Sequence, residues 1–296
     1  MHLTQHLDAN AKLVALLEPL ASADDFLPTA IDGLLIVSAR VPCARSPQIY
    51  EPSLMVLAQG SKLAYLGERT LEYGAGHYLI QALPMPFEYQ TFASAEQPLL
   101  GVSIPIDRSV LGELVMAMGP AEKSMAQTPQ SMTSVPLDDA MRGAVERLLE
   151  CLHDPLDCQV MGQTRLREVL YTALRGPNGG VLRALVEQQG QFARMAGALT
   201  WLHNHYAEPL QIEQLARRAN MSASSFHEHF KRHTLTTPVQ YLKRLRLLKA
   251  KALLIAEALS VAQVAHQVGY QSSSQFSREF KRYFSHSPVQ ARELQA

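Results

Sequence analysis

SASSFHEHFKRHTLTTPVQ, at Ser222–Gln240, returns fifty residues later as SSSQFSREFKRYFSHSPVQ, at Ser272–Gln290. The two stretches are identical at nine of nineteen positions, which is too many for chance. Upstream of them the offset is 49 residues, because the second copy has one extra residue after the aligned pair Asn220 and Gly269. The repeat predicts that this part of the chain folds as two copies of one structural unit.

Each copy predicts a short helix, a tight turn and a second helix. In the first copy, IEQLARRA at 212–219 predicts the short helix, and Asn220 stands at the turn, with Gly269 as its counterpart. Asn and Gly are residue types that readily take a positive φ. Ser222 and Ser272 stand where a serine caps the second helix, and two phenylalanines four residues apart give that helix a buried stripe. The pattern is typical of a helix-turn-helix, whose second helix enters the major groove of DNA.

A long helix is predicted to join the two copies. Thr237 and Pro238 begin it as the N-cap and the first helical residue. From Pro238 to Ala256 this helix is roughly 27 Å long, close to the ~34 Å repeat of B-DNA, so it can hold two recognition helices in successive major grooves. Basic side chains on and around these helices are expected to contact phosphates. They are Lys231, Arg232, Lys243, Arg244, Lys281 and Arg282, together with Arg246, Lys249 and Lys251.

The stretch Pro238–Pro288 resembles the signature of the AraC/XylS family of bacterial transcription regulators. The matching elements are P-x-x-Y-L, R-L-x-x-A-x-x-L-L, V-G-Y and F-S-R-x-F-K-x-x-F. The resemblance covers about a hundred residues and implies an AraC-type DNA-binding domain with two helix-turn-helix motifs. It also implies which side chains read base edges, namely Ser224, His227 and Glu228 in the first recognition helix and Ser273, Ser274, Gln275 and Arg278 in the second.

Glu228 departs from the common pattern of the family, in which a basic or amide side chain is frequent at this position. A carboxylate can accept a hydrogen bond from cytosine N4 but is repelled by phosphate. We therefore expect the first motif to bind DNA more weakly or to read a different base.

The N-terminal part of the chain shows a different pattern. From about Leu34 to Ile106, short apolar runs are broken by glycines and prolines at short intervals, which is typical of an all-β barrel or sandwich. From Asp107 onward, apolar residues three and four apart predict helices. LEYGAGHYLIQALPMPFEY at 71–89 resembles the cupin-like sensor domain of one AraC-type subgroup, which implies inducer binding and pairing of subunits.

These patterns predict an α+β chain of two domains. Residues 1–190 are expected to form a cupin-like β-barrel with flanking helices, which senses a ligand and dimerises. Residues 191–296 are expected to form an all-α double helix-turn-helix domain that binds DNA. Apolar residues of the predicted helix Gln163–Arg175 lie on one stripe that is either core or a dimer face.

Charge is divided between the two domains. The whole chain has 27 basic and 27 acidic residues. Residues 1–190 contain 13 basic and 21 acidic residues, a balance of −8, whereas residues 191–296 contain 14 and 6, a balance of +8. This asymmetry indicates that the C-terminal domain meets a polyanion.

Candidates for contact with a small molecule lie in the β-domain: Cys43, Tyr50, Tyr65, His77 and Tyr89. The charges of Arg40 and Arg45 beside Cys43 favour a thiolate that senses electrophiles or oxidants, although a free cysteine also serves as a small buried apolar group. The tyrosines either line a pocket in the barrel or pack in its core.

A metal-dependent cupin enzyme is the main alternative for the N-terminal domain. Such a metal site needs clustered histidines and a carboxylate, and His77 is the single histidine of the predicted β-region. We expect no metal, no cofactor and no catalysis. The histidine pairs of His203-Asn204-His205 and His227-Glu228-His229 are expected to be surface or groove-side residues, because residues two apart on a helix point in different directions.

The sequence therefore predicts a sequence-specific DNA-binding transcription regulator that is controlled by a small molecule. A regulator that needs no ligand and a cupin enzyme fused to a DNA-binding domain are the alternatives. The expected partners are double-stranded DNA, a small-molecule effector, a second copy of the chain and, for an activator, RNA polymerase, with no membrane. Three cysteines without C-x-x-C spacing are consistent with the cytoplasm.

Overall fold

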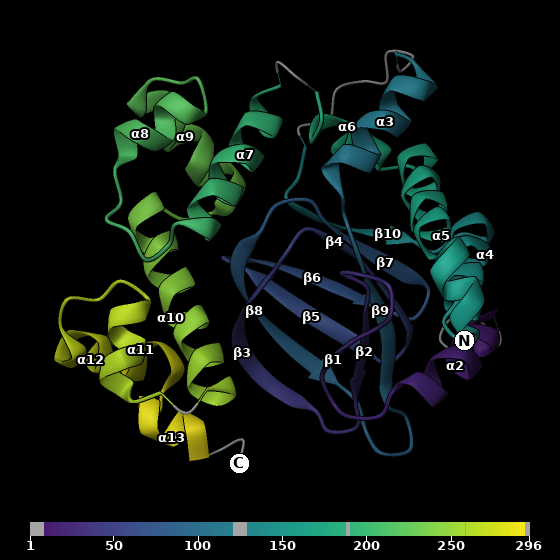
Figure 1. The fold of residues 1–296 in the computed structure, drawn as a ribbon, viewed down its shortest axis with the longest axis horizontal. Coiled ribbons are helices and arrows are strands. Elements are labelled where there is room, and N and C mark those ends of the chain that lie inside the picture. The colour runs from purple at the N-terminus through teal and green to yellow at the C-terminus, as the bar shows by residue number, and fades with distance from the viewer. Residues whose placement is uncertain (1–8, 121–128, 188–189, 258, 294–296) are drawn as a thin grey trace. The chain divides into compact units, whose positions relative to one another are not determined.

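A computed structural model of the chain describes residues 9–120, 129–187, 190–257 and 259–293 (Figure 1). The chain forms two compact units. The first unit comprises Met1–Arg45, Tyr50–Leu83 and Tyr89–Ala193, and the second comprises Arg194–Ala296 with the short segments Ser46–Ile49 and Pro84–Glu88. The predicted α+β class is confirmed, with a sheet-rich N-terminal unit and a helical C-terminal unit.

The strands of the N-terminal unit lie in two sheets. The six-stranded sheet has the order β1 (Phe26–Pro28), β2 (Leu35–Ala39), β9 (Leu99–Pro105), β4 (Ser53–Gln59), β7 (His77–Gln81) and β10 (Met132–Pro136), and its neighbouring strands are antiparallel. The four-stranded sheet has the order β3 (Cys43–Tyr50), β8 (Met85–Phe92), β5 (Ser61–Leu66) and β6 (Arg69–Gly74). Buried and partly exposed residues alternate along β5, so that one of its faces is turned toward the interior.

Two strands of the six-stranded sheet lie outside the predicted β-region. β1 precedes Leu34, and β10 lies in the stretch for which helical spacing was expected. β10 pairs along its whole length with β7, from Met132 opposite Gln81 to Pro136 opposite His77. A segment of five residues shows little periodicity of its own, so pairing with a distant strand decides its structure.

Helices complete the N-terminal unit: α2 (Ala11–Leu17), the 3₁₀ turn Glu18–Leu20, α3 (Arg108–Met118), α4 (Asp139–Cys151), α5 (Pro155–Arg175) and α6 (Gly179–Ala184). Aspartates cap three of these helices, since the side chains of Asp107, Asp138 and Asp154 each accept backbone N–H groups of the first turn. α4 and α5 pack against one another. The apolar stripe of α5 is buried within the chain and is therefore core.

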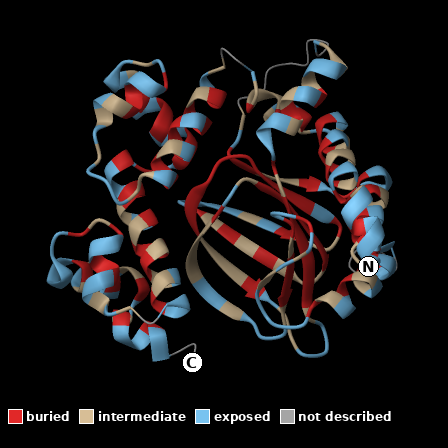
Figure 2. Cartoon of the chain, viewed as in Figure 1, coloured by how far each residue is buried: buried red, intermediate tan, exposed pale blue. Residues whose placement is uncertain are grey.

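The C-terminal unit is helical apart from the short segments Ser46–Ile49 and Pro84–Glu88, which lie in or next to strands β3 and β8. Its elements are α7 (Gln191–Asn204), α8 (Ile212–Arg218), α9 (Ala223–Thr234), α10 (Pro238–Ala256), α11 (Val261–Gln267), α12 (Ser273–Phe284) and α13 (Pro288–Glu293). Its helices have buried residues on one side and exposed residues on the other (Figure 2). Phe276, Phe280 and Phe284 of α12 join Leu247 and Leu254 of α10 in one hydrophobic cluster, which holds the second helix-turn-helix against the connector.

Within the described parts of the chain, no helix combines the length and the apolar character that a membrane span requires.

Candidate nucleic-acid interface

The two copies of the repeat have the same turn. In the first, Asn220 takes a φ of 51°, and the backbone N–H of Met221 donates to the carbonyl of Ala216 at 2.9 Å. In the second, Gly269 takes a φ of 89°, and Tyr270 donates to Ala265 at the same distance. The expected positive φ at both turn residues is confirmed.

Both recognition helices also begin and end in the same way. The Ser222 side chain accepts the backbone N–H of Ser225 at 3.2 Å, and the Ser272 side chain accepts that of Gln275 at 3.2 Å. α9 and α12 each have twelve residues and end at a residue with a left-handed backbone, Leu235 or Ser285. The repeated sequence therefore produces two helices in equivalent local frames, each following a short helix and a tight turn.

The seven side chains for which base reading is expected are all exposed. Ser224, His227 and Glu228 lie on α9, and Ser273, Ser274, Gln275 and Arg278 lie on α12. The opposite faces of the two helices are buried through their phenylalanines. Each recognition helix thus offers a polar face that could reach the edges of bases in a groove.

Corresponding positions on the two polar faces differ in charge. Glu228 corresponds to Arg278 at the repeat offset of 50. The Glu228 carboxylate forms an ion pair with Arg232 one turn further along α9, at 2.7 Å, whereas the Arg278 side chain is exposed. The two faces are therefore built to meet different chemical groups.

Glu279 of α12 forms an ion pair and two hydrogen bonds with side chains of the C-terminal unit. Its carboxylate lies 3.0 Å from Lys243 Nζ of α10, accepts the Tyr270 hydroxyl at 2.9 Å and accepts the Gln275 amide at 3.3 Å. Burial would raise the pKa of this carboxyl, but the hydrogen bonds from Lys243, Tyr270 and Gln275 outweigh it and hold the pKa below its usual value. Lys243 and Gln275 are thus engaged within the protein, and the ion pair ties α12 to the connector.

The other five residues of the expected phosphate set are exposed: Lys231, Arg232, Arg244, Lys281 and Arg282. Arg246, by contrast, donates to backbone carbonyls of Tyr206 and Glu208 at 2.7 and 2.8 Å. Its guanidinium therefore fixes the loop between α7 and α8.

Two histidines that were expected at the surface are buried, which is a correction. His203 and His229 are 7% and 8% exposed, and His203 Nε2 lies 2.7 Å from the Tyr241 hydroxyl. Residues two apart on a helix face different sides, so one member of each pair turns inward. The sequence contains a signal for this burial, because His229 and His233 are four residues, about one helical turn, apart and so lie on the same side of the helix. Their rings stack in the core with centroids 6.4 Å apart.

The candidate ligand residues of the N-terminal unit separate into three places. Tyr50 and Tyr89 lie close together, with ring centroids 6.4 Å apart, and Cys43 Sγ lies 3.7 Å from the Tyr89 hydroxyl. The Tyr65 hydroxyl donates to Gln90 at 2.8 Å, under the guanidinium of Arg45.

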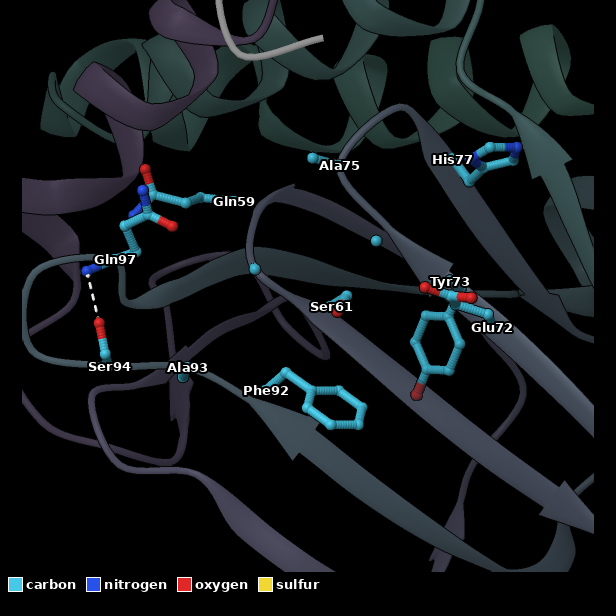
Figure 3. Close-up of a pocket in the computed structure, with 12 residues that line it drawn as sticks. Gln59, Ser61, Glu72, Tyr73, Ala75, His77, Phe92, Ala93, Ser94 and Gln97 are labelled. Atoms are coloured by element: carbon cyan, nitrogen blue, oxygen red, sulfur yellow. Dashed lines mark hydrogen bonds between the residues drawn. The ribbon is translucent and has the colours of Figure 1, made fainter. Parts of the chain in front are cut away.

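His77 lies apart from these residues, at a cavity of about 700 Å³ (Figure 3). The turn between β4 and β5, the turn between β6 and β7 and the segment after β8 line this cavity. Its lining includes the aromatic residues Tyr73 and Phe92 and the polar residues Gln59 and Glu72. These residues were not recognised from the sequence, because no motif marks the turns at the end of a β-domain.

A lysine that was also not recognised lies beside the tyrosine pair. Lys62 is 3% exposed, and its Nζ donates to the Tyr50 hydroxyl at 3.2 Å. The alternation of QGSKLAYL, with Lys62, Ala64 and Leu66 on one face, could have indicated it, since a lysine in phase with apolar residues points inward. Among the residues that the structure describes, no group of three histidine, cysteine, aspartate or glutamate side chains could hold a metal ion.

The fold and the paired motifs define a class: a transcription regulator with an N-terminal regulatory β-domain and a C-terminal double helix-turn-helix. Residues 30–181, half of the chain, match the profile of the AraC-type transcriptional regulator N-terminus, and residues 215–294 match that of a helix-turn-helix domain. The chain belongs to the AraC-type family of transcriptional regulators.

Known relatives agree with this assignment. The transcriptional activator RhaS of Enterobacter sp. (strain 638) is 40% identical over 101 residues, which are 34% of this chain and 36% of RhaS. The match thus spans about a third of that relative's length.

Two solved structures share the fold of most of the chain. Ligand-free ToxT of Vibrio cholerae strain SCE256 has a TM-score of 0.61 and 7% identity, over 91% of this chain and 100% of that chain. ToxT of the same strain with a bound unsaturated fatty acid has a TM-score of 0.59 and 8% identity, over 87% and 93%. At these identities the likeness concerns the fold alone.

Proposed function

We propose that the chain is a sequence-specific DNA-binding transcription regulator, that it is not an enzyme, and that a small molecule controls it. The observation that carries this proposal is the pair of helix-turn-helix motifs with equivalent turns and caps and with exposed polar faces. Double-stranded DNA is bound by residues 191–296, whose balance of +8 favours a polyanion. The name of RhaS, a transcriptional activator, supports the same function.

In this proposal the exposed polar side chains of α9 and α12 read base edges, and the exposed basic side chains around them contact phosphates. Arg278 is suited to a guanine, since a guanidinium can donate two hydrogen bonds to guanine O6 and N7. Glu228 is suited to a cytosine, whose N4 donates. Lys243 contributes less to phosphate contact than the exposed residues do, because Glu279 already neutralises it.

Residues 1–190 hold the effector and pair two copies of the chain. The family match of residues 30–181 and the fatty acid bound to ToxT, whose fold is similar, support an effector in this domain. For pairing, Leu156 and Val160 of α5 are 68% and 64% exposed on one face of that helix, opposite its buried stripe. The regulator acts in the cytoplasm, where the DNA lies, and an activator of this kind also contacts RNA polymerase.

Genome-wide mapping of the sites bound by the tagged chain tests the proposal. The expected result is a set of sites that share one sequence motif with two conserved segments, one for each recognition helix. The matched control is Arg278→Ala, which should lose sites or relax one position of the motif while the protein level stays the same. Bound sites without any shared motif would contradict sequence-specific binding.

A further inference from the structure

Four side chains form a row across the inner face of the four-stranded sheet. In the order of the strands they are Tyr50 of β3, Tyr89 of β8, Lys62 of β5 and Tyr73 of β6. Lys62 and Tyr73 are directly opposite one another in the β5–β6 register. Phe26 of β1, from the other sheet, stacks on Tyr50 with ring centroids 5.4 Å apart. One lysine thus stands inside a group of aromatic rings.

The Lys62 ammonium has few interactions that compensate the burial of its charge. Its Nζ lies 5.2, 5.7 and 5.1 Å from the ring centroids of Phe26, Tyr50 and Tyr89, and it donates one hydrogen bond, to the Tyr50 hydroxyl. No ion pair joins Lys62 to a carboxylate of the described residues within 4.0 Å. Rings compensate a buried cation only in part, and an unpaired buried charge is costly.

The hydroxyls of the row can also donate, although within the protein the Tyr50 hydroxyl interacts with that of Tyr73 and the Tyr89 hydroxyl with Cys43 Sγ. Burial raises the pKa of Tyr50, Tyr73 and Tyr89, so that all three stay protonated at neutral pH. An ammonium and phenol O–H groups in one place complement an anion, and the surrounding rings complement an apolar body.

A cavity lies next to one end of the row. Tyr73, the neighbour of Lys62 across the sheet, also lines the cavity at the end of the β-domain, together with Phe92 (Figure 3). The cavity therefore borders one residue of the row, whereas its lining does not include Lys62, Tyr50 or Tyr89. Its volume of about 700 Å³ is within the usual range of small-molecule sites.

We propose that the effector is a small organic acid whose carboxylate binds the Lys62 ammonium and the Tyr50 and Tyr89 hydroxyls, with its apolar body among the rings. This inference rests on the proposed control by a small molecule in residues 1–190, and it specifies the chemical class of that molecule.

The affinity of the acid depends on pH in a definite direction. Burial lowers the pKa of Lys62 to about 8, although the nearby Cys43 and Asp25 act in the opposite sense. Only the protonated amine pairs with a carboxylate, so the affinity is full below pH 8 and falls as the pH rises through this value. The tyrosines that face Lys62 keep their protons over the same range, because their pKa values are raised.

Calorimetric titration of the full chain with octanoate and benzoate tests the inference, with octanamide and benzamide as uncharged probes of nearly the same shape. At least one acid is expected to bind about tenfold or more tightly than its amide at pH 7, and to lose this advantage by pH 9. Lys62→Met should abolish the preference for the acid. Tyr50→Phe should weaken the acid by about fivefold, the value of one hydrogen bond.

The control variant is Lys12→Met, which removes an exposed lysine of α2 and should leave the preference unchanged. Equal binding of acids and amides, a preference that persists in Lys62→Met, or no binding of either acid at millimolar concentration overturns the inference. Trapping of an aldehyde on Lys62 by borohydride, without acid binding, overturns it as well, since the amine would then be a covalent site.

Failure of the proposed function gives a different result. If the acids bind at Lys62 but leave DNA binding and transcription unchanged, control by this effector is refuted and the anion site stands. If DNA binding responds equally to acids and amides, control by a ligand stands and the anion site is refuted.

Discussion

Glu228 and Arg278 occupy the same place in two equivalent helices and have opposite charges. The Glu228–Arg232 pair is exposed, so it contributes little to stability, and yet it neutralises part of the basic surface of α9. No such pair involves Arg278 among the ion pairs of the described residues. At the scale of single residues, we therefore expect α12 to contribute more to DNA reading than α9.

Replacement of Arg278 by alanine tests this difference. Arg278→Ala should weaken binding to the specific site by about 1–3 kcal/mol and relax the choice at one base pair, because a bidentate contact to a base is lost. Lys281→Ala is the matched control in the same helix. It should weaken specific and random DNA alike, because a phosphate contact does not depend on sequence. Fluorescence anisotropy with both DNAs measures the losses, and an equal loss on both for Arg278→Ala would exclude base reading.

Lys62 gives a prediction for stability. At pH 7 the buried amine is charged in the folded and the unfolded chain, and its burial destabilises the fold. Its pKa is about 8 in the folded state, below the usual 10.5, so this cost declines as the pH rises from 8 toward 10.5. Lys62→Met should therefore be more stable than the unchanged protein by about 1–3 kcal/mol at pH 7, with a smaller difference at pH 10.

Urea unfolding at the two pH values measures this effect. Lys12→Met serves as the control, because the ion pairs of Lys12 with Glu146 and Glu150 raise the pKa of that exposed lysine, so its loss should not stabilise the chain. A loss of stability in Lys62→Met at pH 7 would show that the contacts of the amine outweigh its burial.

At the scale of elements, the turns at Asn220 and Gly269 have the same backbone hydrogen bond but differ in how closely other atoms pack against the turn residue. A Cβ on Gly269 would lie 2.3 Å from the backbone carbonyl oxygen of Ala207, and the φ of 89° is unfavourable for any other residue. Gly269→Ala should therefore destabilise the protein by more than about 1–3 kcal/mol, the usual cost of a strained backbone.

Asn220→Ala is the matched variant for this turn, since Asn220 is exposed and also has a positive φ. It should cost about 1 kcal/mol, from the backbone alone. Thermal or urea unfolding of both variants gives the comparison, and equal costs would show that the Ala207 contact relaxes without penalty.

The connector α10 sets the distance between the two recognition helices, α9 and α12. Its 19 residues extend about 27 Å, and the Lys243–Glu279 ion pair joins it to α12. The two recognition helices should therefore bind base pairs about one helical turn apart on one face of DNA. Insertion of about five base pairs, half a turn, between the two segments should reduce binding nearly to the random-DNA level, whereas about ten should restore part of it. Gel-shift assays measure the affinity for these DNAs. An affinity that is unchanged by the insertion of about five base pairs would mean that only one helix reads DNA.

At the scale of the whole molecule, the neutral net charge is the sum of two opposite halves. If the five exposed basic residues contact phosphates as proposed, the logarithm of the DNA affinity should fall with the logarithm of the salt concentration with a slope of about −4.5 per chain. Titrations between low and physiological salt measure the slope. A slope close to zero would contradict phosphate contact by the five residues, and Arg282→Ala should make it shallower by about one.

Much of this architecture could be predicted from the sequence, because local rules and tertiary packing agree in the repeat. Asn220 and Gly269 reverse the chain, Ser222 and Ser272 cap their helices, and the phenylalanine pairs face the core. Each of these features depends on a few neighbouring residues, so spacing alone indicated it.

The unpredicted features depend on distant contacts. β10 is a strand because of its pairing with β7, and Lys62 meets Tyr50 and Tyr89 because the sheet order places β3, β8 and β5 side by side. His203 and His229 turn inward because of the helices that pack on them. No local sequence pattern indicates which distant residues such a side chain will contact. In the same way, only the fold shows that Tyr65 and His77 lie apart from the pair Tyr50 and Tyr89.

The repeat separates what holds each helix-turn-helix together from what each one reads. Turn, cap and phenylalanine positions are shared by the two copies, whereas the polar faces have diverged, most clearly at Glu228 and Arg278. A substitution on one face therefore leaves both folds and the other reader intact. In a DNA site with one segment for each helix, mutations can then change one segment while the other segment still binds the protein. A regulator of this kind can therefore acquire new target genes through a series of small changes.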